Sequence, residues 1–234
     1  LLGLFRAPLR FLRHPGRRRE MKMKRLQLLL LLALACMFPA VHAGLDTDLL
    51  QIQTQWAEAN YATPKGQQEQ AFDALVAEAR KLADNYPDSA EPKVWLAIVL
   101  STDAGVTGGL GALGKVKEAR RLLEAALQID ATILDGSAYT SLGSLYYQVP
   151  GWPIGFGDDE KAELNLKKAL AINPDGIDPN YFYGDFLLEQ DNYAEAIRYL
   201  EKAGAAQPRP DRPLADRGRQ QEIRAKLAQA RSQQ

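Results

Sequence analysis

The pattern Ala-x-x-x-Leu-x-x-Ala occurs three times in the second half of this 234-residue chain. The copies are Ala119/Leu123/Ala126, Ala162/Leu166/Ala169 and Ala196/Leu200/Ala203. On a helix, each copy places two small residues and one large apolar residue on one face, so a neighbouring helix can approach closely at the alanines and pack around the leucine. An apolar segment with one small residue among large ones precedes each copy, at Ala97, Gly143 and Gly184. The pattern therefore predicts a repeated pair of helices.

Helix pairs of this kind are predicted along most of the chain, which makes the expected fold all-α. The four pairs are expected at 49–59 with 71–82, 91–101 with 115–129, 135–148 with 158–172, and 179–189 with 193–206. Longer inter-helix loops are expected inside the second and third pairs, where glycine and proline gather. Beyond Pro208, Pro210 and Pro213, a polar helix from Leu214 carries apolar residues on one side and is suited to capping the end of a helical stack. Those apolar residues are Ile223, Leu227 and Ala230.

Residues 176–208 resemble the tetratricopeptide repeat, an antiparallel helix pair that stacks into a right-handed α-solenoid. The residues in the register of that family are Tyr183, Gly184, Leu187, Tyr193, Ala196, Leu200, Ala203 and Pro208. The resemblance extends over about residues 70–208. It implies a solenoid of about four helix pairs over residues 44–208, a capping helix over 209–234, and a role in binding other proteins.

Residues 21–43 have the features of a secretory signal peptide: a basic start, an apolar run from Leu26 to about Phe38, and small residues at Val41 and Ala43. We expect cleavage after Ala43 and a periplasmic or secreted product. The apolar run is short for a membrane span, although a retained single-helix anchor is the alternative. Residues 1–20, which precede Met21, are interpreted as an over-extended or untranslated start.

Cys36 offers a second alternative, because a lipoprotein signal places cysteine shortly after a leucine. Here the sequence Ala33-Leu34-Ala35 precedes Cys36, so the leucine is displaced by one position. Membrane attachment is expected only if Cys36 is lipidated.

Removal of residues 1–43 would change the charge of the chain. That segment holds nine of the 29 Lys and Arg residues and one of the 29 Asp and Glu residues, so residues 44–234 carry 20 basic and 28 acidic side chains, a net charge of −8. A surface with this balance is unsuited to nucleic acid.

The segment 1–43 also holds the single cysteine and both histidines, His14 and His42. The remaining residues therefore lack the usual nucleophiles, bases and zinc ligands, and we predict no enzyme activity, no metal and no cofactor.

Two segments between predicted helices contain sequence patterns that suggest a binding function. The glycine-rich segment 105–116 contains G-x-G-x-x-G and most of a P-loop, but Val116 stands where the Mg²⁺-binding Ser or Thr belongs, and no βαβ unit follows. We predict a flexible inter-helix loop and no nucleotide. The segment 149–158 holds Trp152, Ile154 and Phe156 among prolines and glycines. These three side chains either pack back onto the helices or form a lip over a binding groove.

The first helix of each pair lines the concave face in the tetratricopeptide family, and the resemblance implies a groove at Thr140, Ser144, Tyr147, Gln148, Tyr181, Asp185, Leu188 and Glu189. The segments Asp135–Gln148 and Asp178–Glu189 contain no Lys or Arg. A groove without these residues cannot clamp a carboxylate. The acidic triplet Asp158-Asp159-Glu160 is expected to complement a helix N-terminus. Asp175 and Asp178 are expected to lie in a turn, and neither group is expected to bind a metal.

The predicted function is an exported, non-catalytic scaffold that binds a protein or peptide partner in the cell envelope. A second hypothesis is a small-ligand-binding accessory, because the irregular repeats and residues 150–162 bear a looser resemblance to the T-component of TRAP transporters. A third is an enzyme that uses carboxylates on a helical frame. A closed cavity in place of an open groove favours the second hypothesis, and paired carboxylates inside that cavity favour the third.

Overall fold

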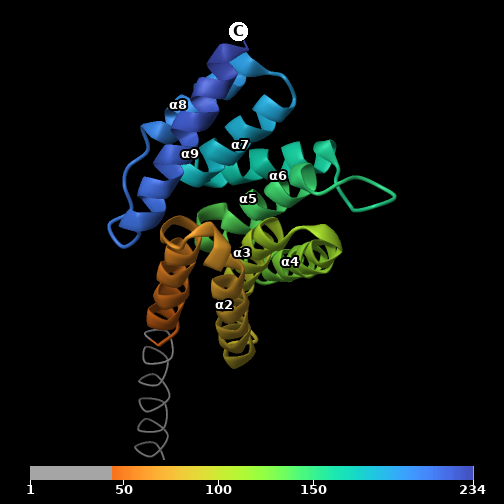
Figure 1. Cartoon of the computed structure of the whole chain (residues 1–234), viewed down its shortest axis with the longest axis vertical. Coiled ribbons are helices and arrows are strands. Elements are labelled where there is room, and N and C mark those ends of the chain that lie inside the picture. The colour runs from red at the N-terminus through yellow and green to blue at the C-terminus, as the bar shows by residue number, and fades with distance from the viewer. Residues whose placement is uncertain (1–43, 234) are drawn as a thin grey trace, which may run out of the picture. The chain divides into compact units, whose positions relative to one another are not determined.

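The computed structural model describes residues 44–233, which are helical over most of their length and contain no strand. The fold described below is that of the compact unit that begins at Asp46. An α-helix over residues 44–57 runs into a π-helical turn, η1, at Glu58–Ala62. The following helices are α2 (Lys65–Asn85), α3 (Glu91–Thr107), α4 (Gly109–Ile129), α5 (Ile133–Gln148), α6 (Asp159–Ile172), α7 (Ile177–Glu189), α8 (Tyr193–Gly204) and α9 (Pro213–Ser232), as Figure 1 shows.

Each helix packs mainly on its neighbour in sequence. The closest pairs are α3 with α4, α5 with α6, and α7 with α8, and successive first helices also touch, α3 with α5 and α5 with α7. Short connections join the members of most pairs, which makes them antiparallel. This arrangement confirms the predicted all-α helical-repeat fold.

The repeated small–large–small faces form the centre of every pair. All nine residues of the three Ala-x-x-x-Leu-x-x-Ala copies have 0% exposed surface. Leu166 of α6 packs onto Gly143 of α5 so closely that a Cβ atom built on Gly143 would lie 2.5 Å from Leu166 Cγ. The two helix axes can therefore approach because one residue of the contact has no side chain.

The glycine-rich segment differs from the prediction. It is not a flexible loop, because α3 continues to Thr107 and α4 begins at Gly109. Only Gly108 separates the two helices, and its φ of 65° lies in the left-handed region that reverses the chain at little cost for glycine. Ala112 and Leu113 lie between glycines and are ordinary helix residues, and each of the two helices is longer than expected by about one or two turns.

The second insertion is a loop, as predicted, from Val149 to Asp158. Pro150 and Pro153 cannot donate backbone hydrogen bonds inside a helix. The amide of Gly157 donates to the carbonyl of Pro150 at 3.0 Å, and the amide of Asp158 donates to the carbonyl of Tyr146 at 2.8 Å. The Asp158 carboxylate then accepts from the amide of Lys161 at 3.0 Å and caps α6, which confirms its expected role.

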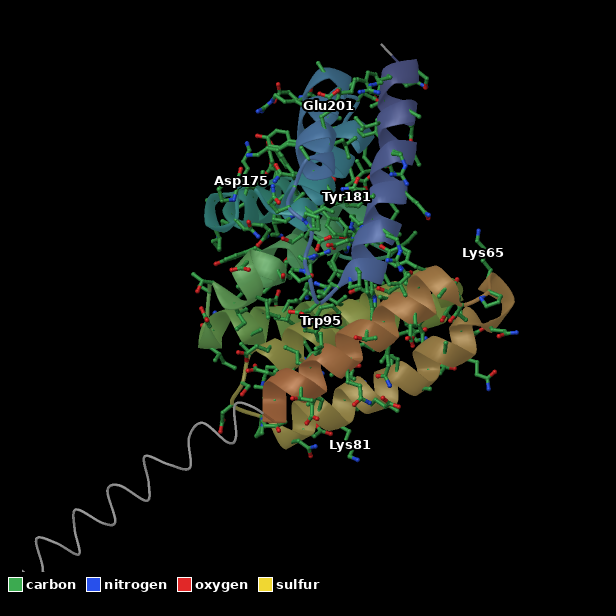
Figure 2. All side chains as sticks on the ribbon, turned by 90° about the vertical axis from the view of Figure 1, so that its left-hand side faces the viewer. Lys65, Lys81, Trp95, Asp175, Tyr181 and Glu201 are labelled. Carbon is green, nitrogen blue, oxygen red and sulfur yellow. The ribbon has the colours of Figure 1, made fainter. Side chains whose placement is uncertain are left out.

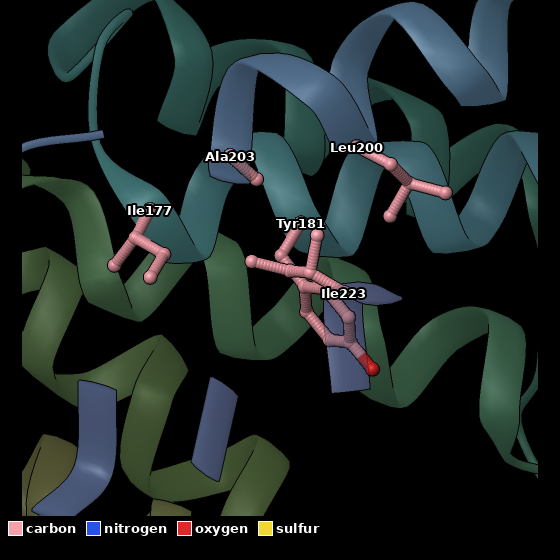
Figure 3. Packing of buried hydrophobic residues seen from close by; sticks show 5 residues of the cluster. All are labelled: Ile177, Tyr181, Leu200, Ala203 and Ile223. Atoms are coloured by element: carbon pink, nitrogen blue, oxygen red, sulfur yellow. The ribbon is translucent and has the colours of Figure 1, made fainter. Parts of the chain in front are cut away.

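The C-terminal helix α9 stacks on the last repeat. Ile223 is 1% exposed and belongs to a cluster with Ile177, Tyr181, Leu200 and Ala203, shown in Figure 3. The first half of α9 also reaches the opposite end of the array, where a Cβ atom built on Gly218 would lie 2.4 Å from Tyr61 Cδ1. Figure 2 shows this part of α9 beside the orange helix that ends in η1. The N-terminal helix with η1 and the C-terminal helix α9 are therefore in contact. This contact crosses the face that is formed by the first helix of each pair.

Candidate functional site: a cavity under the C-terminal helix

A cavity of about 410 Å³ lies between the first helices of the pairs and the N-terminal half of α9. This volume falls within the range of small-molecule sites. Trp95 and Tyr181, on α3 and α7, are two of its wall residues and are labelled in Figure 2. The full lining is Trp56, Asn60, Tyr61, Trp95, Ile98, Ser101, Thr102, Gly105, Val106, Ser137, Thr140, Ser141, Ser144, Gln148, Asp178, Tyr181, Phe182, Arg212, Arg219 and Glu222.

Aromatic rings form part of the cavity wall. Trp56 packs edge-to-face against Tyr61, with ring centroids 5.6 Å apart, and against Trp95 at 6.1 Å. The Trp56 Nε1 proton is donated to the Thr102 hydroxyl at 2.9 Å, so the indole is fixed in place. These rings offer flat apolar surfaces to whatever occupies the cavity.

Small hydroxyl side chains line the α5 side of the cavity. Ser137, Thr140, Ser141 and Ser144 follow the i, i+3, i+4, i+7 spacing of one helical face. The hydroxyls of Ser137 and Thr140 donate to carbonyls of their own helix segment, at 2.7 and 3.3 Å. Each hydroxyl oxygen keeps a lone pair that can accept a hydrogen bond from a ligand.

An ion-pair network joins α7 to the start of α9. The Asp178 carboxylate accepts from Arg209 Nη1 at 2.6 Å and from Arg219 Nε at 2.9 Å. Asp216 binds Arg209, and Glu222 binds Arg219. Burial alone would raise the pKa of Asp178, but the charges of Arg219, Arg209 and Arg212 outweigh it and hold that pKa well below its usual range.

Arg212 is the exception in this network. Its guanidinium lies over the Trp95 ring, 4.9 Å from the centroid, and makes no hydrogen bond or ion pair with the described residues. Its Nε is buried without a partner. Burial, followed by the nearby charge of Arg209, lowers the pKa of Arg212 to about 10. The cavity wall therefore carries a cation whose charge is not neutralised by direct contact.

Four of the eight predicted groove residues line the cavity. They are Thr140, Ser144, Gln148 and Tyr181. The other four, Tyr147, Asp185, Leu188 and Glu189, lie outside this lining. These four residues lie outside the cavity because α9 packs on this face, which the groove prediction did not anticipate.

The contacts around Asp185 explain the difference. The Tyr147 hydroxyl donates to Asp185 Oδ2 at 2.8 Å, and Lys226 of α9 lies 2.6 Å from Asp185 Oδ1 and 3.8 Å from Glu189. Leu188 is 4% exposed. The helix α9 thus covers the second half of α7, so that only the first half faces the cavity.

Tyr181 is both a cavity-lining residue and a core residue, although the sequence analysis placed it in the groove alone. It lines the cavity, yet it is only 6% exposed and packs with Leu200, Ala203 and Ile223 in the core cluster of Figure 3. The guanidinium of Arg219 lies 4.3 Å from its ring centroid. The interpretation of Tyr181 as a groove residue separate from the core is therefore wrong.

The expectation that the groove lacks basic residues is also wrong. Arg212 and Arg219 line the cavity, although the first helices of the last two pairs contain none. Both come from the segment after the repeats, where the sequence 209–219 holds four arginines and two aspartates. A predicted capping segment with so many charged residues is the sequence signal from which arginines at the site could have been predicted.

The predicted lip does not cover this cavity, because Trp152, Ile154 and Phe156 are not among its lining residues. Phe156 packs back, with its ring 5.8 Å from the Tyr146 ring and 4.5 Å from the Arg120 guanidinium. Trp152 and Ile154 project outwards, with 90% and 67% of their surface exposed.

Lys115 of the glycine-rich segment has a structural contact. Its amine lies 2.6 Å from the carboxylate of Asp103, a residue only 1% exposed, and 3.0 Å from the Thr107 hydroxyl. Asp178, expected in a simple turn, is instead the acceptor of the ion-pair network described above.

Within residues 44–233 there is no group of three or more acidic, His or Cys side chains placed to hold a metal ion. The same residues include no helix with the length and hydropathy of a membrane span.

A family model for the tetratricopeptide repeat matches residues 154–231. The crystal structure of the protein MamA is similar, with 19% sequence identity, a TM-score of 0.42, and coverage of 77% of this chain and 91% of that one. No curated protein matches the sequence.

Proposed function

We propose that this tetratricopeptide-repeat protein is a non-catalytic scaffold of the cell envelope that binds a protein or peptide partner on the face of its first helices. Repeats of this family form protein-interaction scaffolds, and residues 154–231 match the family. The location in the envelope rests on the signal-peptide pattern of residues 21–43, which lie outside the described residues.

The aromatic cavity carries this proposal. It lies on the face that repeat proteins of this kind use for binding, and it combines Trp56, Trp95 and Tyr181 with a row of α5 hydroxyls. The contact between Tyr61 and Gly218 spans this face. An extended peptide cannot run through it without displacing α9, so the partner is expected to insert one end or one side chain.

The cavity offers poor acid–base chemistry, in keeping with a binding role. Its two carboxylates, Asp178 and Glu222, both bind Arg219. The pKa of Asp178 is held well below its usual range, which makes its carboxylate a weak base at neutral pH. The carboxylate-enzyme hypothesis requires a pair of acids free to exchange protons, and these two acids are held by arginine.

The test is capture of the partner from envelope extract by the full chain with a C-terminal tag, comparing two added tryptophans. Ser144→Trp fills the cavity, whereas Ala125→Trp adds the same side chain at an exposed position of α4. We expect a partner retained by wild type and Ala125→Trp and lost by Ser144→Trp. Retention of the same partner by both variants would show that binding takes place elsewhere.

Export has its own test, which is N-terminal sequencing of the periplasmic product. A chain beginning at Gly44 supports cleavage after Ala43. A chain beginning at Cys36 with an added lipid mass contradicts it and supports the accessory hypothesis.

A small-ligand-binding accessory is the second candidate function, and the closure by α9 is the observation that favours it. The face of the first helices is not an open groove along its full length, because Lys226 and neighbouring residues of α9 cover α7 at Asp185. What stays accessible is a cavity of about 410 Å³, which suits a small molecule.

A further inference from the structure

We infer that the cavity binds the carboxylate of an apolar, planar ligand, and that Arg212 is the residue that holds this carboxylate. The inference rests on the proposed function in one respect, that this cavity is the binding site. It adds the chemical class of the ligand and the residue that recognises it.

The first argument is the distribution of charge. Three carboxylates and three guanidinium groups surround this end of the cavity, at Asp178, Asp216, Glu222, Arg209, Arg212 and Arg219. Every carboxylate is bound to Arg209 or Arg219. Arg212 alone is left without a bonded anion among the described residues. Arg212 is partly buried, with its Nε shielded from solvent, and a ligand carboxylate would supply the anion that it lacks.

The second argument is the position of the guanidinium. Its Cζ lies over the Trp95 ring, 4.9 Å from the centroid, and the residue is part of the cavity wall. Contact with an aromatic face does not use the N–H donors of a guanidinium. Its two terminal nitrogens make no hydrogen bond with a described residue, so they can donate to a ligand. A carboxylate accepts such bonds in pairs, with both oxygens in the guanidinium plane, which a single neutral acceptor cannot do.

The third argument concerns the rest of the ligand. Trp56, Tyr61, Trp95, Tyr181 and Phe182 provide flat apolar walls, which suit an aromatic ring. A second carboxylate would lie near Asp178 and Glu222, whose negative charges are already within the wall. An amine would face Arg212 and Arg219. The preferred ligand therefore carries one negative group and an uncharged, ring-like body.

Such a carboxylate has two sources, a free aryl acid or the C-terminal aromatic residue of a partner chain. The probes are phenylacetate, its neutral analogue phenylacetamide, and succinate as a dicarboxylate. The peptide probes are acetyl-Ala-Ala-Phe with a free carboxylate and the same peptide as an amide. Binding to the full chain is measured by calorimetry and by the change in tryptophan emission expected near Trp56 and Trp95.

We expect at least one free acid to bind, and its amide to bind about tenfold or more weakly, because a hydrogen bond to a charged group is lost. Binding of phenylacetate identifies a free acid as sufficient, and binding of the peptide acid alone identifies a chain end. Equal binding of acid and amide, preference for succinate, or failure of both acids to bind would overturn the inference.

The variants are Arg212→Gln, at the residue before α9, and, as a control in the first turns of α9, Arg217→Gln, which removes an exposed arginine. We expect about tenfold or greater loss of acid binding in Arg212→Gln and none in Arg217→Gln. Melting curves establish that both variants fold. If Ser144→Trp abolishes partner capture while Arg212→Gln retains full acid binding, the site is correct and the assignment of the carboxylate to Arg212 is wrong.

Discussion

A Cβ atom built on Gly184 would lie 2.8 Å from Leu200 Cγ and 3.1 Å from the Leu200 backbone nitrogen. Gly184 is on α7 and Leu200 on α8, so this contact sets how closely the last pair of helices can approach. Gly143 and Leu166 have the same relationship in the preceding pair, with a corresponding distance of 2.5 Å. The glycine and the central leucine of the repeat pattern are therefore the two halves of one contact.

Gly184→Leu should force α7 and α8 apart and lower the free energy of unfolding by about 1–3 kcal/mol or more through overpacking. Gly114→Leu is the control, because a Cβ atom on Gly114 of α4 would meet nothing within 4 Å. Urea unfolding of both variants checks this. Similar midpoints for the two variants would contradict the close contact.

Asp178→Asn should lower the free energy of unfolding by about 3 kcal/mol, because the buried Arg219 and its neighbour Arg209 lose their shared anion. Asp175→Asn is the control, since that side chain is 87% exposed. Urea unfolding at neutral pH measures the difference. A loss no larger in Asp178→Asn than in Asp175→Asn would show that the network contributes little.

The same network predicts a pH dependence. Because the folded-state pKa of Asp178 is lowered, its contribution is fully present above the unfolded-state pKa of about 4 and is lost as the pH falls below it. We expect wild type to lose more stability than Asp178→Asn between pH 6 and pH 3. Parallel stability curves for the two proteins would contradict the lowered pKa.

Arg212→Gln should leave the free energy of unfolding unchanged or raise it by about 1 kcal/mol, because a partly buried cation without a bonded anion is removed. Thermal melting without added ligand tests this outcome. A marked loss of stability would indicate that the stacking on Trp95 outweighs the cost of burying the charge.

Lys115→Ala should lower the free energy of unfolding by about 3 kcal/mol, because it leaves the carboxylate of Asp103 buried without its cation. ATP is expected to stabilise neither wild type nor this variant. The double variant Asp103→Leu/Lys115→Ala should recover part of that loss, which a double-mutant cycle measures. A rise in melting temperature with ATP that disappears in Lys115→Ala would instead support the P-loop reading.

The repeat faces could be predicted because each is a local pattern. The spacing of Ala196, Leu200 and Ala203 on one helix already states which side is buried, and the structure places all three at 0% exposure. The glycine-rich segment misled the prediction because glycine lowers the tendency of a helix to form without forbidding it. Here Val116 is buried, with 8% of its surface exposed, and α4 begins at Gly109 despite the glycines.

The composition of the cavity could be predicted only in part. Thr140 and Ser144 follow from the register of one helix, but Arg212 and Arg219 reach the cavity because residues 209–219 fold back onto α7. That return depends on contacts between residues far apart in sequence, such as Arg219 with Asp178 and Gly218 with Tyr61. No periodicity within a single helix encodes such contacts.

The meeting of Tyr61 with Gly218 also limits how this fold can change its size. In a helical array with free ends, a further repeat can be added at either end, because each unit needs only one neighbour. Here the first and last helices are neighbours of each other, and a duplicated repeat would separate them and open the cavity between them. The number of helix pairs in this unit is therefore coupled to the existence of its cavity, so insertions and deletions of whole repeats should be tolerated far less than substitutions on the outer surface.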